Sequence, residues 1–158
     1  MFELSRRYIK TAFTFFIVGL FLGLYIIITK YVLGKWVSHQ LITAHVHVLL
    51  FGFVISLIMG VAIWMFPRPR DEMHYSPGLA EITYWFLTLG TVVRFICEIT
   101  SSYINSRILD WLIVLGSTSQ VLAGLLFIYN VWSRVRPVGK QTWFINEGLG
   151  GRQNSILF

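Results

Sequence analysis

Residues 41–66 read LITAHVHVLLFGFVISLIMGVAIWMF, an almost uninterrupted apolar run that carries two histidines, His45 and His47. A helix that spans a membrane needs about 20 largely apolar residues, so this stretch predicts a transmembrane helix. Imidazole is costly in lipid, and a histidine at membrane depth usually has a partner that offsets its burial. Because neutral imidazole is also a common ligand of transition metals and heme iron, both histidines are candidate heme ligands.

Three further apolar runs accompany this one, and the composition agrees with them. Hydrophobic residues make up 56% of the 158 residues, and the mean hydropathy of +0.68 lies well above the range of soluble proteins. We therefore predict an all-α integral membrane protein whose residues 1–133 form a four-helix bundle with short connections. The expected spans are about 8–33, 41–66, 79–101 and 108–132. Residues 134–158, which hold several glycines among polar residues, are expected to form a cytoplasmic tail.

The distribution of lysine and arginine predicts the orientation in the membrane. Nine of the 13 basic residues fall on the side that would hold both termini and the second loop, and four fall on the other side. The positive-inside rule then places both termini in the cytoplasm, with His45 and His47 near the outer face of a cytoplasmic (inner) membrane. The net charge of +6 is thereby explained by topology, and no basic stretch suggests nucleic acid as a partner.

The two histidines cannot serve one iron from one helix. At about 100° per residue they point roughly 200° apart, so they have separate roles. His45 shares a stripe with Gly52, Ser56 and Gly60, small residues that allow close approach of another helix or of a flat macrocycle. His47 shares its face with bulkier residues suited to lipid or side-chain packing. This comparison favours His45 as the inward ligand and makes Gly52 a candidate cofactor-binding residue.

Arg94 and Glu98 lie four residues apart in the third run, at a depth similar to that of His45. Arg94 could pair with Glu98, with Asp110 or with a heme propionate, or it could extend its guanidinium to the outer interface. It is therefore also a candidate cofactor-binding residue. Gln120 in the fourth run needs a polar partner at mid-membrane, for which a second subunit is one source.

Two segments, 45–54 (HVHVLLFGFV) and 60–68 (GVAIWMFPR), resemble the second transmembrane helix of heme-copper oxidase catalytic subunits, above all the cbb-type cytochrome c oxidases and the nitric oxide reductases. The likeness continues through 69–71, 75–77, 79–81 and 84–87, and about half of the chain is covered. In that family the second-helix histidine ligates the low-spin heme near the outer face. The resemblance therefore implies a b-type heme (heme b).

The register of the resemblance leaves the ligand open between the two histidines. Counted back from Pro67-Arg68, an oxidase-like register points to His45, and a reductase-like register points to His47. We prefer His45 as the axial ligand of the heme iron, because of its small-residue stripe, and keep His47 as the alternative.

Most of the family's other metal ligands have no counterpart in this sequence. Later helices of the family supply the copper histidines, the second low-spin ligand and the high-spin heme ligand, whereas this chain has no adjacent His-His pair and no histidine in its fourth apolar run. A complete centre that reduces oxygen or nitric oxide is not expected within it. The resemblance implies a four-helix module rather than the whole enzyme, so activity as an oxidoreductase by itself is not assigned.

Two hypotheses about function follow. The first is a small membrane b-type cytochrome for electron transfer or for chemistry with NO or O2, with its second axial ligand supplied by a homo-oligomer or a larger respiratory complex. The second is a heme-free accessory or assembly subunit of such a complex, in which both histidines only form hydrogen bonds within the bundle.

Overall fold

The computed structural model describes residues 2–66 and 75–135, which form four long helical spans. All four are long and apolar enough to cross a membrane. Within the described residues every regular element is a helix, as the sequence predicts for an all-α membrane protein. The elements are α1 (Phe2–Ile27) with the π-helical η1 (Ile28–Val32), α2 (His39–His47) with the π-helical η2 (Val48–Ile55) and α3 (Ser56–Met65), α4 (Pro77–Ser101), and α5 (Arg107–Val131) with the 3-10 turn η3 (Trp132–Arg134).

Polar residues set the helix boundaries, which differ from the apolar runs by a few residues. The hydroxyl of Ser38 accepts a hydrogen bond from the Leu41 amide, and that of Ser76 accepts one from Leu79, so each serine is an N-cap. The first helix begins at Phe2, about two turns before the expected start, because its first turns are polar and lie outside the apolar run that was used to predict it. Of the expected loop and tail, residues 67–74 and 136–158 lie outside the described part.

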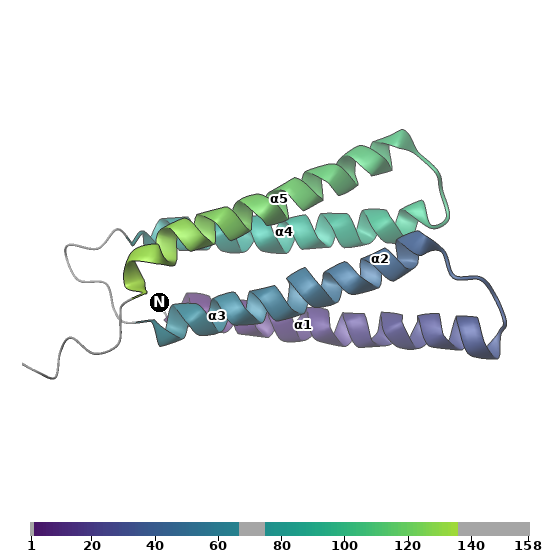
Figure 1. Ribbon diagram of the computed structural model, residues 1–158, viewed down its shortest axis with the longest axis horizontal. Coiled ribbons are helices and arrows are strands. Elements are labelled where there is room, and N and C mark those ends of the chain that lie inside the picture. Colours follow the sequence, from purple (N-terminus) through teal and green to yellow (C-terminus); the bar gives the residue numbers. More distant parts are fainter. Residues whose placement is uncertain (1, 67–74, 136–158) are drawn as a thin grey trace, which may run out of the picture.

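The spans pack in chain order (Figure 1). The second span, made of α2, η2 and α3, lies between α1 on one side and α4 on the other, and α5 packs mainly along α4. We call the end that holds the connections 33–38 and 102–106 the distal end, and the end that holds Phe2, Phe66 and Pro77 the proximal end. If both termini are cytoplasmic, as the charges predict, the distal end is the outer one.

The apolar core gathers toward the proximal half, where α1, α3, α4 and α5 meet. Its buried members are Tyr8, Met59, Ile63, Tyr84, Leu87 and Ala123. Many large apolar side chains on the outside of the helices are exposed, which suits a protein whose solvent is lipid. The apolar core thus belongs to the proximal half, and the polar network of the distal half lies outside it.

Arg134 ties the ends of the second and fourth spans together. Its side chain is completely buried, and its Nη2 donates to the carbonyls of Ile63 (3.2 Å) and Phe66 (2.7 Å) at the end of α3. The guanidinium also lies over the rings of Tyr75 and Phe66, 4.6 and 5.9 Å from their centroids. These donors satisfy carbonyls that a helix C-terminus leaves without partners.

Candidate functional site

The imidazole of His45 faces α1. Its Nδ1 lies 3.1 Å from the carbonyl oxygen of Gly19, a distance at which a protonated Nδ1 donates to the carbonyl. Gly23 lies against the same ring, because a Cβ added there would come within 2.7 Å of Cε1 and 3.4 Å of Nε2. The two glycines of α1 therefore form the wall against which this imidazole rests.

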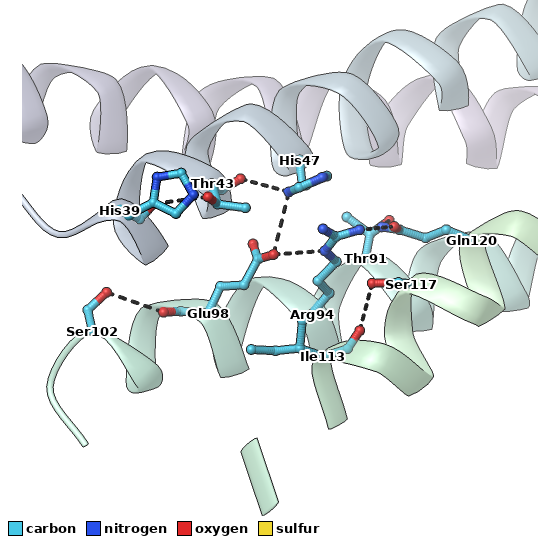
Figure 2. A network of polar contacts seen from close by, with 10 residues as sticks. All are labelled: His39, Thr43, His47, Thr91, Arg94, Glu98, Ser102, Ile113, Ser117 and Gln120. Atoms are coloured by element: carbon cyan, nitrogen blue, oxygen red, sulfur yellow. Dashed lines mark hydrogen bonds and ion pairs between the residues drawn. The ribbon is translucent and has the colours of Figure 1, made fainter. Parts of the chain in front are cut away.

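His47 points to the other side of the second span, toward α4 (Figure 2). Its Nδ1 lies 2.9 Å from the carbonyl of Thr43, one turn earlier, and 3.4 Å from Oε1 of Glu98. Its ring stacks on Phe51 with the centroids 6.0 Å apart. The sequence-based expectation that the two histidines have separate environments is confirmed by these contacts: one belongs to the α1 interface, and the other to the α4 interface.

A polar network continues from His47 across α4 to α5 (Figure 2). The Nε of Arg94 donates to Oε1 of Glu98 over 2.8 Å, and its Nη1 donates to Oε1 of Gln120 over 3.2 Å. The amide of Gln120 then donates to the hydroxyl of Thr91. Of the three partners considered for Arg94, the one that it contacts in the structure is Glu98. The polar partners of Gln120 lie in the same chain, so a second subunit is not needed to satisfy it.

The stripe of small residues beside His45 is covered by α1. A Cβ on Gly52 would come within 2.7 Å of the Phe15 ring, and one on Gly60 would come within 2.8 Å of the Tyr8 Cβ. The hydroxyl of Ser5 on α1 donates to the Gly60 carbonyl over 2.6 Å. The sequence allowed either another helix or a macrocycle to pack on this stripe, and in the structure a helix, α1, packs there. A macrocycle would not find free space on the face of Gly52.

The π-helical segment η2 begins at Val48, directly after His47. π-helical turns are rare and often occur at functional sites. Nothing in the pattern of apolar residues indicated this segment, since a run of aliphatic side chains fits an α-helix equally well. The segment lies between the two histidines and the proximal part of the second span, so it sets how the small-residue face continues from His45 to Gly60.

In both histidines Nε2 is the nitrogen that could bind a heme iron, whereas α1 leaves no space for the macrocycle on the face of Gly52. In each ring Nδ1 is held by a backbone carbonyl, and within the described residues Nε2 makes no hydrogen bond. A carbonyl on the other nitrogen is the arrangement that orients metal-bound histidines. The described residues contain no group of three or more His, Cys, Asp or Glu that could hold a metal ion, so a non-heme metal cluster has no ligand set in this part of the chain.

Comparison with curated proteins and with solved structures gives no match. Comparison with protein families gives the family described as cytochrome c and quinol oxidase polypeptide I, which matches residues 3–146. The matched range contains all four membrane spans, both histidines and the polar network around Glu98. Because the match covers most of the 158 residues, this chain belongs to the cytochrome c and quinol oxidase polypeptide I family.

Proposed function

We propose that this protein is a small membrane-bound b-type cytochrome that binds heme b through His45 near the distal end. Membership in a family of heme proteins supports the cofactor, and one observation on His45 supports the ligand. Its Nδ1 is bonded to the Gly19 carbonyl, which leaves Nε2 with a free lone pair. His47 has the same arrangement with the Thr43 carbonyl, but its Nδ1 also lies 3.4 Å from Oε1 of Glu98, and for this reason we prefer His45. A heme bound there supplies one-electron redox chemistry and, where a coordination position is open, binding of NO or O2.

The chain's own residues prepare the imidazole for this role. The carbonyl of Gly19 fixes the tautomer and makes the ring a better donor at Nε2. Gly23 leaves the space in which the ring lies, since any larger side chain would contact Cε1. His47 faces α4 and hydrogen-bonds away from this position, so it does not supply a second axial ligand to the same iron. A second copy or another subunit of a respiratory complex is the source that we propose for such a ligand.

Alanine substitutions of the histidines test the proposal directly. We expect His45→Ala to remove the Soret absorbance of the purified protein, whereas His47→Ala retains it. His39→Ala is the matched control, because that histidine is exposed at the start of α2. Loss of heme with His47→Ala alone would transfer the ligand to His47, and purified protein without a Soret band under any condition of heme supply would end the heme proposal.

Gly23→Ala probes the seat of the imidazole without removing a nitrogen. The added methyl would lie 2.7 Å from Cε1, closer than atoms in contact can come, so the ring must turn. We expect lower heme content or a shifted Soret maximum. Gly124→Ala is the control, since a Cβ there meets nothing within 4 Å. Addition of CO to the reduced protein then distinguishes an open coordination position, where the bands shift, from two axial ligands, where they stay.

A second candidate function is a heme-free accessory or assembly subunit of a larger respiratory membrane complex. The observation that favours it is that both histidines already form hydrogen bonds within the bundle and that α1 fills the small-residue face. Isolation from native membranes in a mild detergent tests it. Stoichiometric large subunits without heme in this chain would support it, and an isolated heme-loaded homo-oligomer would contradict it.

A further inference from the structure

The carboxylate of Glu98 has one oxygen that no described residue satisfies. Oε1 accepts a hydrogen bond from Arg94 and lies 3.4 Å from Nδ1 of His47. Oε2 is buried and has no hydrogen-bond partner among the described residues, and the Glu98 residue as a whole is only 3% exposed. An unsatisfied buried acceptor costs roughly 1–3 kcal/mol, and more when it is charged, so this oxygen calls for a donor.

The hydrogen bonds that the neighbouring side chains donate go to acceptors other than Oε2. Arg94 uses Nε on Oε1 of Glu98 and Nη1 on Gln120, and Nδ1 of His47 is shared with the Thr43 carbonyl. Arg94 also supplies the positive charge that balances the carboxylate. Because the charge is balanced, the missing group is better supplied by a neutral donor than by a cation, whose burial would leave a charge uncompensated.

A polar route leads from Glu98 to the distal end. The hydroxyl of Ser102, one turn further along the chain, donates to the Glu98 carbonyl over 3.2 Å, and the hydroxyl of Ser38 donates to Ser102 over 3.0 Å. Glu98 lies three residues before the end of α4 at Ser101, about 4.5 Å along the helix axis at 1.5 Å per residue. The Glu98 backbone therefore lies about one turn from the distal end of α4, and the hydroxyls of Ser102 and Ser38 lie on its distal side.

The polar groups stop in the middle of the membrane. From Arg94 the network passes to Gln120 and Thr91, and the Thr91 hydroxyl ends on the Leu87 carbonyl, 2.7 Å away. Leu87 belongs to the apolar core that fills the proximal half. A route for water from the distal end would thus be closed on the proximal side.

We propose that a water molecule binds Oε2 of Glu98 and that it enters from the distal end between Ser38 and Ser102, through an inlet that ends at the Arg94–Gln120–Thr91 network. Water is small, neutral and able to donate, and buried waters form about three hydrogen bonds to groups of this kind. The Ser38–Ser102 pair at one end and the carboxylate at the other supply such partners. This inference does not depend on heme binding.

Water-edited solid-state NMR of the ¹³C-labelled protein in lipid bilayers tests the inlet in the unaltered chain. The Glu98→Gln variant identifies the carboxyl signal of Glu98. We expect polarisation to pass from water to this carbon about as fast as to that of the exposed Glu3. Transfer as slow as that to the buried side chain of Leu87 would overturn the proposal. A Glu98 signal that shifts when sodium replaces potassium would also overturn it, because the ligand of Oε2 would then be a cation.

Discussion

Two glycines bring the backbones of α4 and α5 close together, and this contact allows a specific prediction. A Cβ on Gly116 would lie 2.9 Å from the backbone oxygen of Gly90 and 3.2 Å from the backbone nitrogen of Arg94. A Cβ on Gly90 would in turn lie 2.9 Å from the Gly116 oxygen. Neither contact can be relieved by a side-chain rotation, because the opposing atoms belong to the backbone.

Gly116→Ala must therefore move the helices apart. Atoms in van der Waals contact stay about 3.5 Å apart or more, so α4 and α5 have to separate by roughly half an ångström at their crossing. Overpacking of this kind costs about 1–3 kcal/mol. Alanine also favours the helix over glycine by up to about 1 kcal/mol, which acts in the opposite direction.

Gly124→Ala on the same helix is the control that separates the clash from the higher helix propensity of alanine. Its Cβ would meet nothing within 4 Å, so this variant gains the helix preference without the clash. Unfolding by SDS titration in mixed micelles, followed by circular dichroism, measures both variants. We expect Gly116→Ala to be less stable than Gly124→Ala by about 1–3 kcal/mol. Equal stabilities would show that α4 and α5 do not cross at these glycines, and would refute the packing argument.

Three further predictions concern buried polar groups, and all are measured by the same titration. Arg94→Gln leaves the Glu98 carboxylate without its ion pair and should lower the free energy of unfolding by about 3–5 kcal/mol. The double variant with Glu98→Gln should recover most of that stability. No recovery would mean that the two residues are not coupled. Tyr8→Phe removes a buried hydroxyl without a described partner and should leave the stability unchanged or raise it. Tyr84→Phe loses the 2.8 Å hydrogen bond to a threonine of α1 and should lower the stability by about 0.5–1.5 kcal/mol. A larger loss for Tyr8→Phe than for Tyr84→Phe would contradict these hydrogen-bond assignments. Arg134→Gln should cost about 1–3 kcal/mol, because two carbonyls at the end of α3 lose their donor, and an unchanged midpoint would show that this clamp is not needed.

The four spans could be predicted from the sequence because hydropathy over about 20 residues reflects one dominant physical cost, that of polar groups in lipid. The helix ends could not be predicted as well. Phe2 starts α1 well before the apolar run, since a helix can continue beyond the lipid with polar residues such as Glu3 and Arg6, which form an ion pair of 3.2 Å. The π-helical η2 also escaped prediction, because its aliphatic residues show no local preference that distinguishes it from an α-helix.

For the candidate site, the faces of the helices and the pair of Arg94 with Glu98 within one helix could be predicted, whereas contacts between different spans could not. The helical repeat placed His45 and His47 on different faces, and the structure confirms this. Which span covers each face depends on the packing order of four helices, and no angle within one helix contains that information. For the same reason Gln120 was assigned a polar partner without a location, although Thr91 and Arg94 stand directly across from it in the structure.

The position of the second span explains why the two histidines differ. It lies between α1 and α4, so a side chain near its distal end meets either the glycines of α1 or the charged residues of α4. Against Gly19 and Gly23 the imidazole of His45 finds a backbone carbonyl and no competing charge, which leaves its second nitrogen available. Against α4, His47 meets a carboxylate that is already paired with Arg94, in the distal half, where the apolar core does not reach. The packing order of the spans thus gives the two histidines different surroundings within three residues of sequence, and this difference is why we propose His45 rather than His47 as the heme ligand.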